Sequence, residues 1–293
     1  MDEFKINGKY YSVAMNKIWN CEDTNYVTYY LKSVLKQANV TTTPYELYKQ
    51  GKWDWAAQKQ IAMKCKNAGI GGMSFTYEDA MMYSAGSRFV KYNGKQFSSN
   101  MDDPTLAKAW RELASLREDG ALNSAYDLTG FQQGKVGLFV GIAYNMWKES
   151  EAITLCKGGA NNAEAVPVAG PTQSSAYVPV RTKTWGVAKG AKNPEGAAYF
   201  LRYFLDVNNI NFDEDFLHDQ FRTVFNIITD KKAKKSSASD QGIVAYVDKK
   251  AYTSLTWKLG QSTSAQIQTT INAQKALVNN SVNQANKDLK RVK

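Results

Sequence analysis

Short apolar runs alternate with amphipathic stretches along the middle of this chain. Residues 135–141 (KVGLFVG) are a mostly apolar run of strand length, and residues 165–168 and 184–188 are two further strand candidates. These runs lack the clean alternation of a strand with one face in water, which indicates strands that are covered on both faces. Set between helices, they predict an α/β fold.

The same sequence motif predicts the start of three helices: a capping residue followed by proline at the first helical position. They begin at Thr43-Pro44, Asp103-Pro104 and Asn193-Pro194. The second and third carry apolar residues at helical spacing, which predicts that both pack on a core. These residues are Leu106, Trp110, Leu113 and Leu116 in the second helix, which ends near Gly120, and Ala197, Phe200, Leu201, Phe204 and Leu205 in the third.

The other segments predict a mixed α/β body followed by a helical tail. Residues 10–15 are expected as a strand and residues 27–38 as a helix, and Asp54 is expected to cap a helix that reaches about Ala68. Asn93-Gly94 between two apolar segments predicts a hairpin. The tail is expected to contain four helices, at residues 213–229, 242–259, 264–277 and 281–292.

Composition and charge narrow the possible functions without selecting one. The 293 residues are 43% hydrophobic and 22% charged, which is typical of a globular protein with two lobes or one large domain. The net charge of +10 can indicate an anionic partner, but much of it lies in lysine clusters at residues 231–235 and 287–293 that are typical of a solvated surface. No apolar run approaches a membrane-spanning length, and no signal peptide is present at the start, MDEFKINGKYY.

Catalytic and metal-binding motifs are scarce. His218 is the single histidine, which argues against His-rich metal sites and most His-dependent triads. Cys21, Cys65 and Cys156 have no metal-ligand spacing and allow at most one internal disulfide, and Cys65 is expected to be a buried thiol. The glycines after Ala68 lack the lysine and Ser/Thr of a phosphate-binding loop and indicate a helix end. We therefore expect no enzyme activity, no cofactor and no metal.

A collinear set of short motifs covers most of residues 7–207. They are NGKYYSV at 7–13, YYLK at 29–32, TPYEL at 43–47, GKWDW at 51–55, SAG at 84–86, RFV at 88–90, FQQGKV at 131–136 and AKNPEGAA at 191–198. In this order they resemble motifs of the extracellular solute-binding proteins that feed ABC importers, specifically the sugar-binding, maltose-binding-protein-like group. The set departs from the family at Leu31, where asparagine is usual.

The resemblance implies the two-lobe α/β architecture of the type II periplasmic binding proteins. In this family the GKxY strand comes well into the chain, whereas here it stands at residues 8–11. We therefore expect the first part of the N-terminal lobe to be absent. The expected division is residues 1–20 as an inter-lobe crossing strand and lobe remnant, 21–207 as the C-terminal α/β lobe, and 208–293 as a helical tail that returns to the N-terminal lobe.

Aromatic residues near the expected strand ends are the candidates for sugar contact. Sugar-binding clefts need flat aromatic faces and a few convergent polar groups, and open α/β sheets bind ligands at strand ends. The candidates are Asn16, Trp19, Tyr77, Tyr144, Asn145, Trp147 and Trp185. Core packing is the alternative for each aromatic residue, and a turn or surface position for each asparagine. For Trp53, Trp55 and Trp110 core packing is the preferred interpretation.

The resemblance implies a substrate-binding component of an ABC transporter that binds a mono- or oligosaccharide between two lobes and delivers it to the permease. It further implies an extracytoplasmic monomer, lipid-anchored in its full-length form, that binds no nucleic acid. The alternative from another class is a basic interaction domain for an acidic polymer or nucleic acid, whose affinity would fall steeply with salt.

Overall fold

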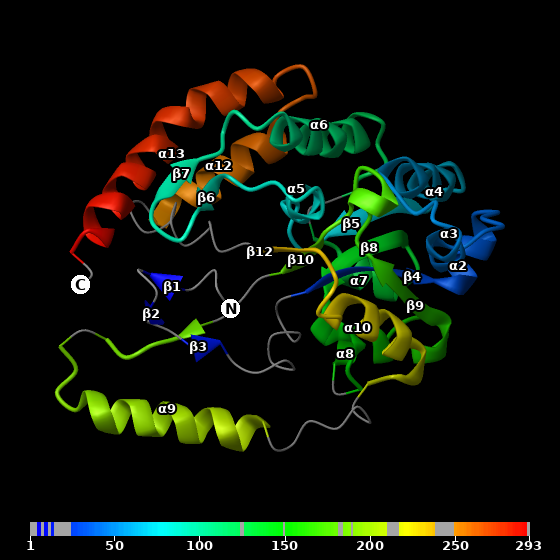
Figure 1. Ribbon diagram of the computed structural model, residues 1–293. Coiled ribbons are helices and arrows are strands. Elements are labelled where there is room, and N and C mark those ends of the chain that lie inside the picture. Colours follow the sequence, from blue (N-terminus) through cyan, green and yellow to red (C-terminus); the bar gives the residue numbers. More distant parts are fainter. Residues whose placement is uncertain are drawn as a thin grey trace.

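A four-stranded mixed sheet forms the centre of the computed structural model (Figure 1). The structure describes residues 5–6, 9–10, 13–14, 25–123, 126–148, 150–180, 184–188, 190–209, 217–237 and 249–291. The sheet has the strand order β5 (Gly71–Phe75), β8 (Val136–Ile142), β4 (Tyr26–Leu31) and β9 (Ala163–Pro167). β4 runs antiparallel to both neighbours, whereas β5 and β8 are parallel. The predicted α/β class is confirmed.

The prediction of one helix over residues 27–38 is wrong in its first half. Tyr26–Leu31 is the strand β4, and the helix α2 (Lys32–Gln37) begins only after it. The run YVTYYL consists of aromatic, β-branched and leucine residues, and all six are buried, so the strand is covered on both faces and shows no alternation. The Tyr29 hydroxyl donates a hydrogen bond to the backbone oxygen of Ile142 at 2.8 Å, which satisfies this polar group inside the core.

Side-chain caps begin the helices at the predicted positions. These helices are α3 (Pro44–Lys49) after Thr43, α4 (Trp55–Asn67) after Asp54 and α6 (Pro104–Glu118) after Asp103. In each, the side-chain oxygen of the cap accepts a hydrogen bond from a backbone N–H of the first turn, which the helix itself leaves unpaired. α4 packs against β5 and β8, and the four predicted apolar residues of α6 are buried.

Short elements complete this larger part of the molecule. The predicted hairpin is confirmed as β6 (Val90–Tyr92) and β7 (Phe97–Ser99), with Gly94 at φ +88° in its turn, a conformation that favours glycine. The short helices are α5 (Ala80–Ser84), α7 (Leu128–Gln132), α8 (Glu151–Thr154) and α10 (Arg222–Thr229), with 3₁₀ turns η2 (Ala143–Met146), η3 (Ala160–Asn162), η4 (Gln173–Ser175) and η6 (Asp219–Phe221).

Two long helices form the end of the described tail, α12 (Lys249–Gln261) and α13 (Ile267–Leu289). The sequence predicts two helices where α13 is continuous, because its buried stripe runs through Val278 and Val282 without a break. α13 packs on the β6–β7 hairpin, where the Asn286 amide binds both the backbone N–H and the carbonyl of Phe97. Among the described helices, none is both long and apolar enough to cross a lipid bilayer.

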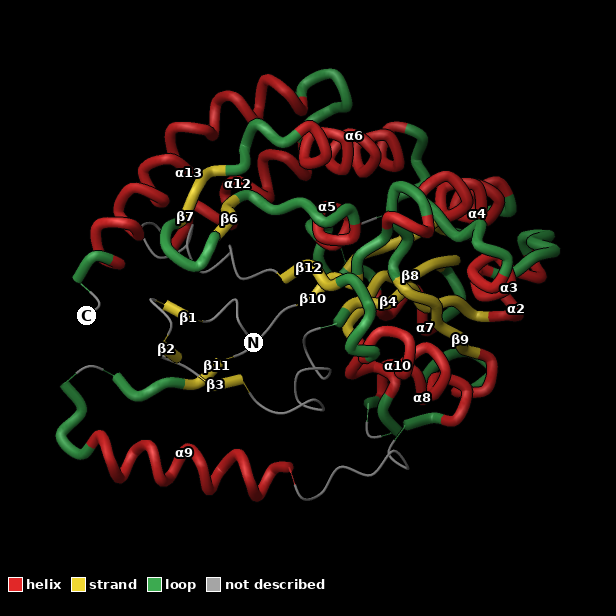
Figure 2. Tube along the Cα trace, viewed as in Figure 1, coloured by secondary structure: helices red, strands yellow, loops and turns green. Residues whose placement is uncertain are grey.

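A smaller part contains short strand pairs and the helix α9 (Pro194–Asn209). β1 (Lys5–Ile6) pairs with β2 (Lys9–Tyr10), and β3 (Val13–Ala14) pairs with β11 (Thr184–Trp185). A further pair is formed by β10 (Val178–Val180) and β12 (Lys235–Ser237), which run parallel. An isolated β-bridge between Val180 and Asn25 links this pair to the start of β4 in the main sheet. Figures 1 and 2 show α9 apart from the four-stranded sheet.

The prediction that α9 packs on a core is wrong for Phe200, one of the two aromatic residues on the predicted face. Tyr199, Phe200 and Tyr203 are 69%, 65% and 68% exposed. Phe204 is half-buried and stacks on Phe200 with ring centroids 6.0 Å apart. The helical spacing of its apolar residues predicts that one face of α9 is buried, but other described residues bury only part of that face.

Three tryptophans expected to pack in the core do so. Trp110 is 1% exposed and stacks on Phe89 with ring centroids 6.4 Å apart. The indole N–H groups of Trp53 and Trp55 donate hydrogen bonds to the backbone oxygens of Pro167 and Ala169, at 2.8 and 2.9 Å. These bonds satisfy the polar edge of each ring, and the two tryptophans fasten the start of α4 to the end of β9.

We expect Trp110→Ala to lower the free energy of unfolding by about 3–5 kcal/mol, because it removes a fully buried ring and leaves a cavity. Tyr203→Ser, at an exposed ring on α9, should change it by no more than about 0.5 kcal/mol. Urea unfolding followed by far-UV circular dichroism measures both values. Equal losses in the two variants would contradict the described burial.

Candidate functional site

The carboxyl ends of β5 and β8 lie side by side, next to the start of β4. This edge of the main sheet is formed by strand ends and not by an outer strand. Phe75 of β5 stands opposite Val140 of β8, and Ile142 of β8 stands opposite Tyr26, the first residue of β4. Open α/β sheets bind ligands outside the carboxyl ends of their strands. The loops that leave β5 and β8 at this edge, named here the sheet-edge site, are therefore the candidate functional site.

Tyr77 follows β5 directly and is 43% exposed. Its ring meets the buried ring of Tyr26 edge to face, with centroids 6.1 Å apart. The core aromatic residue at the start of β4 thus supports an exposed aromatic residue at the end of β5. Tyr77 offers the kind of ring surface that stacks on the apolar face of a ligand.

The turn η2 after β8 holds a second group of candidate residues. The half-buried Tyr144 stacks on Trp147, with ring centroids 6.1 Å apart and an interplanar angle of 25°. Trp147 is only 4% exposed and meets Phe225 of α10 edge to face at 5.7 Å. The Trp147 ring has little free surface for a ligand, so its place is beneath Tyr144 as a support.

Asn145 supplies a polar group in the same turn. It is 8% exposed, and its side-chain amide makes no hydrogen bond to another described residue. Gly141 leaves room for this amide, since a Cβ at residue 141 would stand 3.2 Å from its Nδ2. The amide atoms of Asn145 are not among the fully buried polar atoms without a partner, so they reach solvent, and a ligand hydroxyl at this site can replace that water.

Tyr126 is an exposed aromatic residue that the sequence analysis missed. It is 58% exposed, and its ring contacts Phe139 of β8 at a centroid distance of 6.1 Å. The next residue, Asp127, caps α7, and its backbone N–H donates a hydrogen bond to the Ser74 hydroxyl of β5 at 2.8 Å. The signal that could have found Tyr126 is its position immediately before a capping aspartate.

The structure brings four of the seven predicted site residues to the sheet-edge site: Tyr77, Tyr144, Asn145 and Trp147. Trp185 lies instead in β11, where it stands opposite Val13 in a two-stranded pair. Asn16 and Trp19 lie outside the described residues. The roles of all seven in ligand binding stay predictions.

A partly buried ion pair joins the sheet-edge site to the helical tail. Glu78, next to Tyr77, lies 3.7 Å from the guanidinium of Arg117, which also donates a hydrogen bond to the backbone oxygen of Ser262. Burial raises the pKa of the Glu78 carboxyl, and the charge of Arg117 opposes that rise. Gly260 of α12 makes the approach possible, because a Cβ there would stand 2.4 Å from a Glu78 carboxylate oxygen.

The pKa values of His218 and of the two described cysteines are shifted by their surroundings. Burial and the charge of Lys148 lower the pKa of His218, whose backbone N–H binds the Met146 carbonyl of η2. Burial raises the pKa of the Cys65 and Cys156 thiols to about 11 and about 12, so neither is a ready thiolate. Within the described part of the chain, no group of three His, Cys, Asp or Glu side chains could hold a metal ion.

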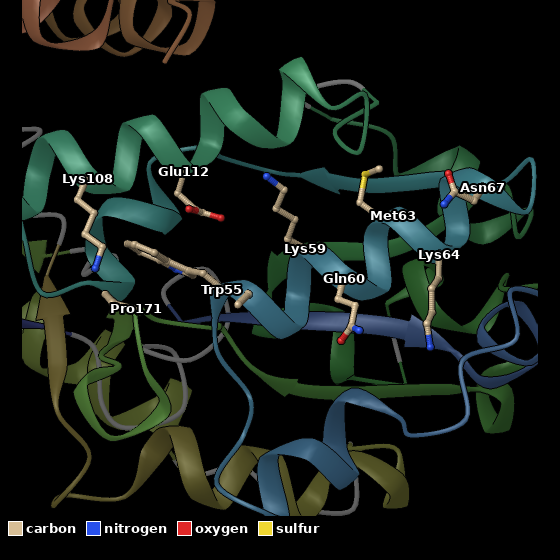
Figure 3. Close-up of a pocket in the computed structure, with 10 residues that line it drawn as sticks. Trp55, Lys59, Gln60, Met63, Lys64, Asn67, Lys108, Glu112 and Pro171 are labelled. Carbon is tan, nitrogen blue, oxygen red and sulfur yellow. The ribbon is translucent and has the colours of Figure 1, made fainter. Parts of the chain in front are cut away.

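A separate groove of about 650 Å³ lies between α4 and α6 (Figure 3). It is lined by Trp55, Ala56, Lys59, Gln60, Met63, Lys64, Asn67, Lys108, Glu112 and Pro171. The Lys59 ammonium pairs with Asp119 and binds the Ser115 hydroxyl, and Gln60 and Lys64 point away from α6 in Figure 3. The groove therefore does not gather its lysines into a continuous basic surface.

Comparison with solved structures identifies the fold. The cyclic α-maltosyl-1,6-maltose binding protein from Arthrobacter globiformis superposes with a TM-score of 0.63 at 13% identity, over 95% of this chain and 73% of that chain. A sugar transporter protein from Arthrobacter chlorophenolicus A6 with bound laminaribiose gives 0.61 at 14%, over 100% and 74%. The galacto-N-biose/lacto-N-biose I-binding protein of the ABC transporter from Bifidobacterium longum, in complex with lacto-N-biose, gives 0.61 at 14%, over 96% and 72%.

No protein-family model matches the sequence, and no curated protein matches it. The chain has the periplasmic-binding-protein-like fold of the sugar-binding proteins of ABC transporters. The fold that the collinear motifs imply is confirmed. The match covers about three quarters of each solved chain, so a part of each has no counterpart among these residues.

The ionisation of Glu78 should appear in the pH dependence of stability. Because the folded state raises this pKa, protonation favours folding: the contribution is complete below the unfolded-state pKa and is lost as the pH rises through the folded-state value. The stability of the wild type relative to Glu78→Gln should therefore increase when the pH falls from 7 to 4, as measured by urea unfolding.

Glu118→Gln is the matched control with the opposite sign. Hydrogen bonds from Ser264 lower the pKa of the Glu118 carboxyl, so the wild type should lose stability relative to this variant as the pH falls. The same sign for both variants would contradict the described environment of Glu78.

Proposed function

We propose that this chain is the substrate-binding component of an ABC transporter and binds an uncharged mono- or oligosaccharide at the sheet-edge site. The observation that carries the proposal is the exposure of Tyr77, Tyr126 and Tyr144 around the carboxyl ends of β5 and β8. Aromatic rings stack on the apolar face of a pyranose, and the unpartnered Asn145 amide suits a hydroxyl. The solved structures of this fold with bound laminaribiose and lacto-N-biose support the ligand class.

Ligand binding on this account closes two parts of the molecule about a hinge. One part is the body around the four-stranded sheet, on which α12 and α13 pack through α6 and β7, and the other is the smaller part with β1, β2, β3, β11 and α9. The antiparallel pair of β3 and β11 joins an early segment to a late one, which suits a crossing between lobes. The permease would recognise the closed form, because closure fixes surfaces of both parts in one arrangement.

The partners and the location follow from this function as parts of the proposal. The chain would act outside the cytoplasm, as a lipid-anchored monomer in its full-length form, and deliver sugar to the permease subunits. The non-enzymatic role is supported by the raised pKa of both described thiols and by the fold of the solved sugar-binding proteins. The solved structures of this fold are sugar-binding proteins, which does not support the alternative of a nucleic-acid or acidic-polymer partner.

The smaller part is proposed to be incomplete on its own. The aromatic face of α9 is more than three-fifths exposed at Tyr199, Phe200 and Tyr203, whereas an aromatic face of this width is ordinarily covered. A further layer of the N-terminal lobe would cover it and close over the sugar. The chain by itself is then expected to bind sugar weakly.

Isothermal titration calorimetry with maltose, laminaribiose and lacto-N-biose tests the proposal. We expect millimolar binding of at least one sugar, about tenfold weaker in Tyr77→Ala and in Tyr144→Ala because each removes a stacking ring. Tyr45→Ala, in α3 beyond the carboxyl end of β4, is the control with unchanged affinity. Equal affinity in all variants, or no binding of any sugar, would count against the sheet-edge site, and nanomolar binding would show that the cleft is complete.

A further inference from the structure

A second groove, of about 580 Å³, lies between the two tail helices α12 and α13. It is lined by Trp257, Lys258, Gln261, Ser262, Ala265, Gln266, Thr269, Thr270, Ala273 and Gln274. None of these residues belongs to the β5 and β8 loops of the sheet-edge site. The groove is therefore a separate feature of the molecule.

The chemistry of the lining is neutral and rich in hydrogen-bonding groups. Three glutamine amides and three hydroxyls line the groove, together with one indole ring, two alanines and a single charged residue, Lys258. Amides and hydroxyls each donate and accept hydrogen bonds, as the hydroxyls of a sugar do. The lining has no acidic side chain for a metal ion and only one basic side chain, Lys258, for an anion.

Trp257 presents a large aromatic surface at this groove. It is 66% exposed, whereas Leu255 and Leu259 of the same helix are almost fully buried. α12 thus packs on the molecule through its leucines and turns its tryptophan outward. An exposed indole beside polar amides is the arrangement that stacks on the apolar face of a pyranose.

Gln274 supplies an independent observation. This residue is 8% exposed and lines the groove, and its amide makes no hydrogen bond to another described residue. Neighbouring groups on α13 do find partners, since the Thr270 and Ser262 hydroxyls are 2.8 Å apart and the Gln268 amide bonds to Asn272. The amide atoms of Gln274 are not among the fully buried polar atoms without a partner, so they are open to the groove, where a sugar hydroxyl can take the place of water.

We propose that the α12–α13 groove is a second saccharide site. Trp257 stacks on a pyranose ring, and the Gln274 amide exchanges hydrogen bonds with its hydroxyls. This assignment stands on the residues of the groove and does not require the sheet-edge site to bind. A peptide partner is less well matched, because the groove has one large apolar side chain and otherwise small or polar ones.

The indole N–H signal of Trp257 in a ¹H–¹⁵N correlation spectrum tests the site on the full chain. Its absence in Trp257→Phe identifies it, and maltose and laminaribiose are the probes, each added to 20 or more millimolar (roughly the range of weak sugar binding). We expect this signal to shift with saturation. In the two Trp257 variants, which lack the indole, the side-chain amide signals of Gln274 report binding instead, and the affinity should be about tenfold weaker in Trp257→Ala. Trp257→Phe, which keeps an aromatic face, should retain most of the affinity.

Two further comparisons make the result specific. Gln274→Leu should weaken the groove affinity at least about fivefold, whereas Gln268→Leu, at an exposed glutamine of the same helix, should not change it. In the double variant Tyr77→Ala/Tyr144→Ala the Trp257 signal should still shift when sugar is added. This variant therefore distinguishes a failure of the sheet-edge site from a failure of the groove.

Three results would overturn the proposal. They are a Trp257 signal that no sugar shifts, a shift unaffected by Gln274→Leu, and a shift that disappears with the sheet-edge variant. Self-association that Trp257→Ala abolishes, seen by sedimentation velocity without any sugar effect, would assign the ring to a contact between protein chains instead.

Discussion

The burial of β4 between β8 and β9 is the constraint on which the candidate site depends. Every residue of this strand is buried, and the Tyr29 hydroxyl binds the Ile142 carbonyl across the sheet. Because β4 is antiparallel to β8, its first residue meets the last residue of β8 and lies at the same edge as the end of β5. The packing of Tyr26 against Tyr77 then holds the exposed Tyr77 ring against the buried core.

Elements that a few neighbouring residues determine could be predicted from the sequence. Elements whose form depends on packing against distant segments could not. Asp54 and Asp103 begin helices because a side-chain oxygen satisfies the first turn, which is visible in a few residues. The apolar and aromatic sequence of β4 is compatible with either a buried strand or a helix. Its pairing with the two neighbouring strands makes it a strand. On α9 the reverse holds, since the pattern predicts that Phe200 is covered and this side chain is 65% exposed.

The candidate site was predictable to a similar extent. Tyr77 and Tyr144 follow two strands, so the rule that ligands bind at strand ends places them at one edge. The burial of Trp147 depends on Phe225, which is distant in the sequence and reaches it only through α10. The place of Tyr126 depends on its contact with Phe139 of β8 and on the hydrogen bond from the next residue, Asp127, to Ser74 of β5, and neither contact is visible in the local sequence. Contacts between distant segments therefore decide which aromatic rings are exposed at the site and which are buried beneath the exposed rings.

The central claim is that the sheet-edge site binds a sugar by aromatic stacking. A crystal structure of the chain grown with laminaribiose tests it most directly. The account predicts a pyranose ring stacked on Tyr77 or Tyr144, with a hydroxyl in hydrogen-bond distance of the Asn145 amide. A disaccharide bound elsewhere, with these three side chains free of it, would contradict the account.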